Sequence, residues 1–172
     1  MAIDLKTTVD TGPMSSFQWL AIGICIVLNM IDGFDVLVMA FTAASVSAEW
    51  ALSGAQIGML LSAGLFGMAA GSLFIAPWAD RIGRRPLILL CLVVSGVGML
   101  LSSMSQSPTQ LALLRGLTGL GIGGILASSN VIASEYASKR WRGLAVSLQS
   151  TGYALGATLG GLIAVWLLSH WG

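Results

Sequence analysis

The first long apolar stretch, FQWLAIGICIVLNMIDGFDVLVMAFTAA (residues 17–44), decides the fold, and it contains two aspartates. About 20 apolar residues are enough to cross a bilayer as a helix. A charged side chain at the bilayer centre costs at least ~2.5–3.5 kcal/mol, so Asp32 and Asp35 need a reason to be there. Residues i and i+3 of a helix point to nearly the same side. We therefore expect both carboxylates to face the protein interior or a water-filled pathway, and we look for function there.

The composition of the whole chain is that of a membrane protein. It is 56% hydrophobic and 9% charged, whereas soluble domains carry about a quarter charged residues. We predict an all-α membrane protein with five transmembrane helices. The spans cover approximately residues 17–44, 55–79, 87–105, 109–132 and 144–169. Ser53 and Ser107-Pro108 look like helix starts, and Pro77 is expected to bend the second span or mark its last turns.

Basic residues set the predicted orientation. Outside the spans, Lys and Arg lie in the N-terminal tail (residues 1–16) and in the loops after spans two and four. The positive-inside rule places the tail and both loops in the cytoplasm. No cleavable signal is visible, because the first sixteen residues are polar and the next apolar run is too long. Since the chain stops just after a span, we interpret residues 17–172 as a partial bundle that needs a C-terminal half of the same transporter.

Other function classes find little support in the sequence. Cys25 and Cys91 lie alone in separate spans, which indicates neither a disulfide framework nor a metal site. A net charge of +1 gives no indication of a nucleic-acid partner. There is no nucleophile–base set and the single histidine is His170, so we expect no enzyme activity and no metal or organic cofactor. The sequence shows no ring of repeated filter residues, which would indicate a channel.

Spans two and five share a stripe of small residues. The stripe consists of Gly64, Gly67 and Gly71 in span two and of Gly152, Gly156 and Gly160 in span five. Small residues at this spacing let helix backbones approach closely. If spans 1–3 and 4–6 form a repeated pair, spans two and five occupy equivalent places, as in many transporters. Generic helix packing is the alternative explanation.

The loop after span two, APWADRIGRR (residues 76–85), resembles the signature loop of the major facilitator superfamily, Gly-x-x-x-Asp-Arg-x-Gly-Arg-Arg. Ala76 replaces the opening glycine. Topology-setting charge explains the arginines but not Asp80 or Gly83, and Gly83 permits a tight turn. The resemblance implies that Asp80 acts in gating near the positive end of a helix from the other half. Its implied partners in a cytoplasmic charge network are Arg81, Arg84 and Arg85.

Span four carries a second motif, RGLTGLGIGG (residues 115–124), that resembles another superfamily signature, an intramembrane arginine followed by spaced glycines. We reject its Rossmann-like Gly-x-Gly-x-x-Gly, because no strand precedes it. Arg115 lies about 9 Å inside the outer boundary and Asp35 about 13 Å, with Asp32 about 4.5 Å deeper. We expect Arg115 to pair with these aspartates or to bind substrate. Snorkelling of Arg115 to the outer interface is the alternative.

Two polar residues near the inner end of span four are further candidates. Asn130 lies inside the span and is expected either to bind substrate or to hydrogen-bond a neighbouring helix. Glu135 is expected at the inner interface, where it could meet Arg142 or an arginine of the first basic loop. A solvated surface glutamate explains Glu135 equally well.

The segment Asp32-Gly33-Phe34-Asp35 resembles the Asp-Gly-[Phe/Tyr]-Asp signature of the aromatic acid:proton symporters, one branch of the superfamily. This resemblance implies an importer of aromatic or related organic carboxylates in the bacterial inner membrane, with the proton as coupling ion. We expect the aspartates to titrate as a coupled pair, with Asp35 as the proton carrier. A structural Asp–Arg bridge is the alternative for this pair.

Two other kinds of function are compatible with these motifs. Within transporters, the substrate could be another organic anion or a sugar, because the pocket also needs the second half. A non-transporting membrane scaffold or sensor belongs to a different class. Buried Asp32, Asp35 and Arg115 disfavour it, since a passive scaffold gains little from intramembrane charge.

Overall fold

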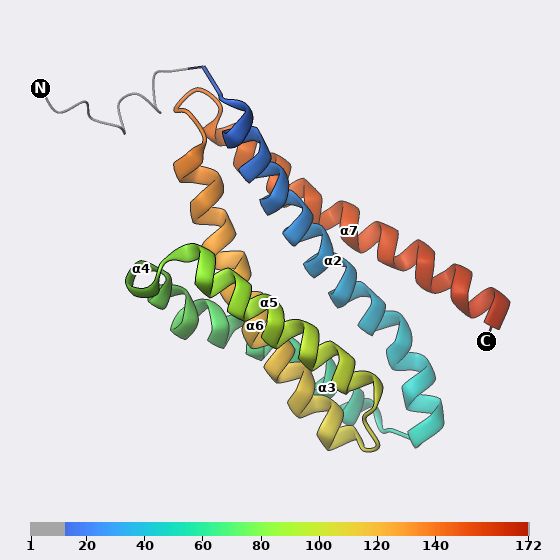
Figure 1. Cartoon of the computed structure of the whole chain (residues 1–172). Helices are drawn as coiled ribbons and strands as arrows, with labels where there is room; N and C mark the ends of the chain where they lie inside the picture. Colours follow the sequence, from blue (N-terminus) through green and yellow to red (C-terminus); the bar gives the residue numbers. More distant parts are fainter. Residues whose placement is uncertain (1–12, 172) are drawn as a thin grey trace, which may run out of the picture. The chain divides into compact units, whose positions relative to one another are not determined.

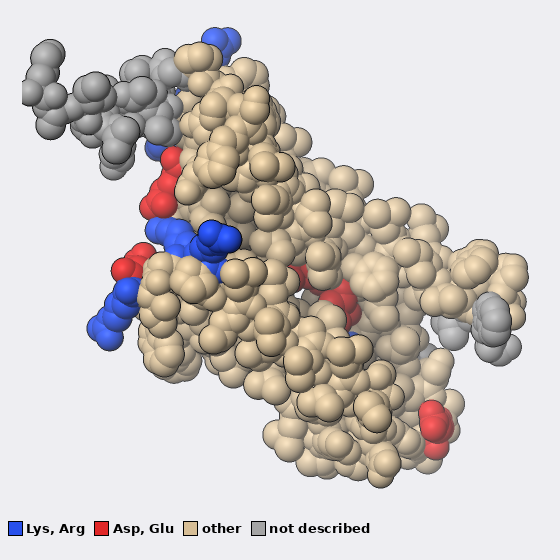
Figure 2. Space-filling model, in the orientation of Figure 1, with Lys and Arg blue, Asp and Glu red and all other residues tan. Residues whose placement is uncertain are grey.

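Helices make up the secondary structure of residues 13–171, which the computed structural model describes, and none of these residues lies in a strand. Five helices are long and apolar enough to cross a membrane, which confirms the predicted all-α membrane fold. Charged side chains are few on the visible surface (Figure 2). Most of the predicted tail, residues 1–16, lies outside the described residues.

Four of the five long helices are longer than the predicted spans, whereas the second is shorter than predicted and ends at Ala70. Their bounds are α2 (Ser16–Trp50), α3 (Gly54–Ala70), α5 (Arg84–Ser103), α6 (Pro108–Tyr136) and α7 (Arg142–Trp171). Ala48 and Glu49 favour helix, and no glycine or proline interrupts the chain before Gly54, so α2 continues six residues past its predicted end. It stops where Ala51 takes a positive φ of 49°.

Both predicted helix starts carry the expected caps. The Ser53 hydroxyl accepts a hydrogen bond from the Gln56 backbone N–H (3.4 Å), and the Gln56 side chain accepts one from the Ser53 N–H (2.9 Å). This reciprocal capping box satisfies two backbone donors that the helix leaves open. At the start of α6, the Ser107 hydroxyl accepts a hydrogen bond from the Gln110 N–H (3.3 Å).

The C-terminal end of the second span is irregular, as Pro77 predicts. A π-helical segment, η1 (Gly71–Ile75), follows α3 and leads into a 3-10 turn, η2 (Ala76–Trp78), and the short helix α4 (Ala79–Ile82). Proline has no N–H and its ring clashes with the carbonyl four residues earlier, so a regular α-helix cannot pass through this position. The wider π turn immediately before it absorbs the distortion.

The chain divides into two compact units, which we describe separately. The first unit consists of Met1–Leu37 and Ser129–Ile163, which are the N-terminal part of α2, the end of α6 and most of α7. Its apolar core joins Ile22, Ala137 and Ala145, with Met14 and Ile26 packed against them. The Gln18 side chain also donates to the Tyr136 carbonyl (2.8 Å), which ties α2 to the end of α6.

The second unit consists of Val38–Ser128 and Ala164–Gly172. A core of Met39, Leu60 and Leu111 joins the later part of α2 to α3 and α6. Glycines of α6 contact two neighbouring helices. Gly119 and Gly123 lie against α3, whereas Gly121 faces the Cys91 carbonyl on α5. The spaced glycines of the predicted second signature therefore let two helices approach α6 at once.

Each unit is built around one closely packed pair of helices (Figure 1). In the first unit, glycines of α7 lie against α2. In the second, glycines of α3 and of the following segment η1 lie against α6. The contacts are Gly152 on Ile26, Gly156 on Met30 and Gly160 on Phe34, and Gly67 on Gly116 and Gly71 on Leu120. Residue numbers rise together in both sets, so both pairs are parallel.

The two pairs correspond to each other by span number. The first unit pairs spans one and five, and the second pairs spans four and two. Exchanging span one with four and span two with five converts one pair into the other, which agrees with an internal repeat of three spans. The glycine stripes predicted for spans two and five are therefore the close-contact faces of these pairs.

Candidate functional site

The acidic pair lies near the middle of α2. Asp32 is 3% exposed and Asp35 is half-buried. The two carboxylates interact electrostatically, as the i, i+3 spacing predicts. The pair lies near the middle of α2, and its depth in the membrane relative to Arg115 stays a prediction.

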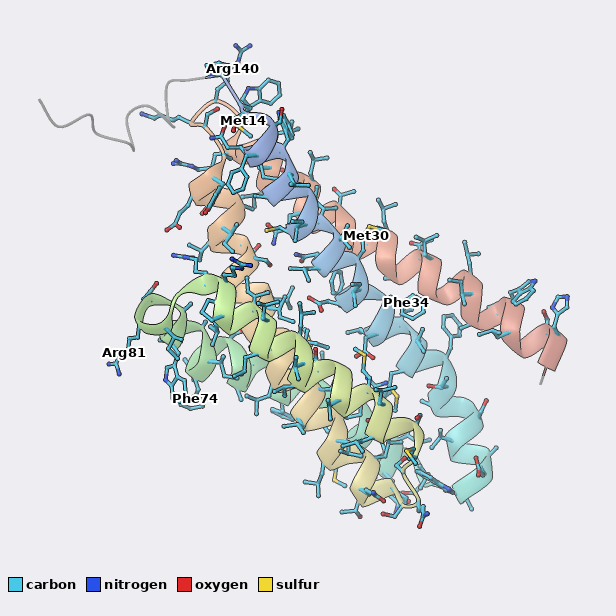
Figure 3. All side chains as sticks on the ribbon, in the orientation of Figure 1. Met14, Met30, Phe34, Phe74, Arg81 and Arg140 are labelled. Carbon is cyan, nitrogen blue, oxygen red and sulfur yellow. The ribbon has the colours of Figure 1, made fainter. Side chains whose placement is uncertain are left out.

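Helix α7 lies against Gly33, which separates the two aspartates of the acidic motif. A side-chain carbon at Gly33 would collide with the Tyr153 carbonyl, so only glycine fits between the two aspartates. Met30 and Phe34 lie on the stretch of α2 that runs beside α7 (Figure 3). Tyr153 on α7 interacts electrostatically with both Asp32 and Asp35. The glycine of the motif therefore allows the close approach that brings Tyr153 to the acidic pair.

A buried amide cluster lies next to this pair and joins three helices. The Gln149 side chain on α7 donates from Nε2 to the Ser129 hydroxyl on α6 (3.0 Å). Asn29 on α2 donates from Nδ2 to the same hydroxyl (3.4 Å) and to the Cys25 carbonyl (3.0 Å). Because Asn29 precedes Asp32 by three residues, the amide cluster and the acidic pair share one face of α2.

Two acceptor oxygens in this region have no hydrogen-bond partner among the described residues, Oδ2 of Asp32 and Oε1 of Gln149. Both atoms are buried. Buried polar atoms are nearly always paired, and an unpaired one costs about 1–3 kcal/mol. An accumulation of such atoms is typical of a site that receives a proton or a ligand.

The sequence motifs do not identify three residues of this site, Asn29, Ser129 and Gln149. Their signal was present, because each is a polar residue inside an apolar span. Asn29 also extends the Asp32–Asp35 series by one step of three residues. Serine and amide side chains occur widely in helix packing, however, so their convergence becomes visible only when α2, α6 and α7 come together.

The two remaining candidates of span four lie in different units. Asn130 belongs to the first unit and is exposed, whereas its neighbour Ser129 is fully buried in the amide cluster. Arg115 belongs to the second unit and is half-buried on α6. Its pairing with Asp32 or Asp35 would join the two units and stays a prediction, as does substrate binding by Asn130.

The signature loop forms a tight turn in the second unit. Gly83 has φ 97° and ψ 148°, a region that is essentially limited to glycine. The turn connects α4 to α5 and sets an ion pair between Arg84 Nη2 and Asp80 Oδ1 (3.7 Å). Arg81 and Arg85 are exposed, and Arg81 points away from α4 (Figure 3). The gating role of these residues stays a prediction.

The second basic loop connects α6 to α7 in the first unit. Arg142 donates from Nε to the Ser134 carbonyl in the last turn of α6 (2.8 Å), and Glu135 is the next residue along the chain. The Ser138 backbone N–H contacts the Met14 sulfur (3.3 Å). The proposed charge network between this loop and the signature loop would cross the two units and stays a prediction.

Comparison with known proteins decides the family. The sequence profile of the Major Facilitator Superfamily matches residues 22–172. This chain belongs to the major facilitator superfamily. The residues that match the major facilitator superfamily include the loop around Asp80 and Gly83.

Three relatives in the superfamily are named for aromatic acids. A gallate transporter of Pseudomonas putida is 38% identical over 99% of this chain, which covers 38% of that protein. A 4-hydroxybenzoate transporter of Acinetobacter baylyi is 33% identical over 99% of the chain and 37% of that protein. A 3-(3-hydroxy-phenyl)propionate transporter of Escherichia coli is 32% identical over 89% of the chain and 38% of that protein. The chain thus spans less than two fifths of the length of these relatives.

Proposed function

We propose that this chain is part of a proton-coupled symporter that imports aromatic carboxylates. Two observations support the proposal. The relatives that match nearly the whole chain are named as transporters of gallate, 4-hydroxybenzoate and hydroxyphenylpropionate. The observation that carries it is the acidic pair, because Asp32 and Asp35 lie together at the middle of a membrane-spanning helix, against α7. Intramembrane carboxylates of this kind mark proton relays and ion pathways.

The proposed mechanism assigns different tasks to the two aspartates. Asp35 is half-buried whereas Asp32 is 3% exposed, so Asp35 exchanges the proton with the outer pathway and Asp32 shares it. The substrate carboxylate binds a cationic partner, for which we propose Arg115. With the acidic pair neutralised and the anion bound, the loaded carrier re-orients and releases both inside, as a ligand that favours one conformation shifts the equilibrium toward it. Five spans do not form both halves around a midplane site, so the mechanism applies to the full-length protein.

The proposed setting is a bacterial inner membrane. We propose a cytoplasmic N-terminus, because the positive-inside rule places both basic loops on that side. The C-terminal half of the same transporter would then supply the other wall of the substrate site. No cofactor besides the proton takes part in this scheme.

Uptake by the full-length protein in cells tests the coupling. We expect Asp35→Asn and Asp32→Asn each to abolish accumulation driven by an inward proton gradient, because an amide cannot take up and release the proton. Glu49→Gln is the matched control, since Glu49 is an exposed carboxylate near the end of the same helix. Accumulation that still follows the pH gradient in both aspartate variants would rule out the proposed coupling.

A second uptake experiment tests the substrate class. Radiolabelled aromatic carboxylates, aliphatic carboxylates and sugars are offered to the same cells. We expect saturable uptake of the aromatic carboxylates and none of the sugars. Uptake of a sugar or of an aliphatic anion in preference to the aromatic acids would move the chain to a different branch of the superfamily.

A further inference from the structure

The nitrogen of the buried Gln149 amide has a hydrogen-bond partner, whereas its oxygen has none among the described residues. Its Nε2 donates to the Ser129 hydroxyl (3.0 Å). The Ser129 hydroxyl also accepts a hydrogen bond from Asn29 Nδ2 (3.4 Å). The Asn29 amide is held in its orientation because the same nitrogen also donates to the Cys25 carbonyl (3.0 Å). A serine oxygen can accept two hydrogen bonds, so both amides donate to it. The Gln149 amide oxygen is thereby directed away from Ser129.

What the cluster lacks is a hydrogen-bond donor. Gln149 is fully buried, and its Oε1 has no partner within the described part of the chain. On α2, about one turn after Asn29, Asp32 Oδ2 is a second buried acceptor that has no hydrogen-bond partner among these residues. An apolar side chain of the same size would avoid this cost, so an amide here is suited to a donor that comes from outside the fold.

The amide cluster lies close to accessible positions. Asn130, next to Ser129 on α6, is exposed. Tyr153, one turn beyond Gln149 on α7, is half-buried and interacts electrostatically with Asp32 and Asp35. A small group that enters beside Tyr153 therefore has only one helical turn to pass before it meets the Gln149 oxygen.

The geometry points to a subsite in which Gln149 Oε1 accepts a hydrogen bond from a ring hydroxyl of the substrate. This inference rests on the proposed function and makes it more specific, because an aromatic carboxylate with a ring hydroxyl carries both the anion and an O–H donor. A ligand that has the hydroxyl donates a hydrogen bond to the buried Gln149 oxygen. A ligand that lacks the hydroxyl leaves the acceptor unpaired, and sites built in this way discriminate against it.

Ligand binding to the purified full-length protein tests the inference. Affinities are measured for benzoate, 3-hydroxybenzoate and 4-hydroxybenzoate, which differ only in the ring hydroxyl. We expect at least one hydroxy acid to bind wild-type protein about 10-fold more tightly than benzoate, as one buried hydrogen bond predicts. Gln149→Met removes the acceptor at similar volume, so it should bring the affinity for the hydroxy acid to within about 2-fold of the affinity for benzoate.

Two further variants separate recognition from folding. Gln106→Met changes an exposed glutamine between α5 and α6 and should keep the wild-type preference. Ser129→Ala keeps the Gln149 side chain but removes the hydrogen bond that orients its amide, so it should reduce the preference for the hydroxy acid over benzoate. Ser129→Ala also decides the question if Gln149→Met gives no folded protein.

The opposite outcomes are equally definite. A preference for the hydroxy acid that survives in Gln149→Met and Ser129→Ala would overturn the subsite, and so would an equal loss for all three acids. Equal binding of the three acids to wild-type protein would overturn the subsite alone, with an enclosed water as the partner of Gln149. If wild-type protein binds none of them, the proposed function falls as well.

Discussion

At the scale of single residues, the strongest requirements fall on two glycines that have different tasks. Gly83 takes a backbone conformation that other residues adopt only under strain, and this conformation turns the chain between α4 and α5. Gly33 has an ordinary helical conformation, but the Tyr153 carbonyl occupies the place of a side chain. The first glycine therefore shapes the signature loop, and the second determines how closely α7 approaches the acidic pair.

We predict that Gly83→Ala destabilises the full-length protein by about 1–3 kcal/mol, because alanine at φ 97° is strained. Thermal unfolding in detergent measures the change as a lower midpoint. Gly96→Ala is the control, since a side chain there meets nothing within 4 Å and alanine favours helix. Equal midpoints for the two variants would contradict the role given to Gly83.

The sequence predicts the charged part of the candidate site better than its neutral part. Asp32 and Asp35 are conspicuous because an apolar span rarely carries carboxylates, and their shared face follows from helical spacing. The amide cluster of Asn29, Ser129 and Gln149 could not be predicted, since each residue alone resembles an ordinary packing residue. Only the contact of three helices shows that their side chains meet.

At the scale of elements, carbonyl-on-glycine contacts determine which helices pair. The Met30 carbonyl lies against Gly156 in the first unit, and the Met68 carbonyl lies against Gly123 in the second. Lipid tails are as apolar as leucine, so helices in a bilayer gain most from such close packing. The glycine stripes were visible in the sequence, but the partner of each stripe was not, because spacing within one helix does not identify the opposing surface.

We predict that Gly156→Ala destabilises the protein by about 1–3 kcal/mol, because the added carbon meets backbone that cannot rotate away. Gly23→Ala on α2 is the matched control, since its added carbon meets nothing within 4 Å. Gly23→Ala should leave the unfolding midpoint unchanged or raise it. Comparable losses in both variants would show that helix contact does not explain the stripe.

At the scale of the whole molecule, two compact units share the long helices α2, α6 and α7. Five spans and their approximate positions follow from apolar length alone. The helix ends do not, because α2 continues as a helix beyond its apolar residues to Trp50. The correspondence between the α2–α7 and α3–α6 pairs also required the structure, since it depends on contacts between distant segments.

We predict opposite sides for the two loops that flank α6. In full-length protein in intact cells, Gln106→Cys should react with a membrane-impermeant maleimide, and Lys139→Cys should react only after permeabilisation. Both positions are exposed, and the native Cys25 and Cys91 are buried, so wild-type protein provides the background. Labelling of Lys139→Cys in intact cells would reverse the proposed orientation.

The amide cluster has a consequence for biogenesis. Asn29 and Ser129 are 100 residues apart in the chain, and a ribosome that adds ~5–20 residues per second needs about 5–20 s between them. Throughout this interval α2 carries the polar side chains of Asn29, Asp32 and Asp35, while Ser129 and Gln149 of the amide cluster have not yet been synthesised. The polar face of α2 is therefore completed only after α6 and α7 have been made, and the insertion machinery must shelter this face until then.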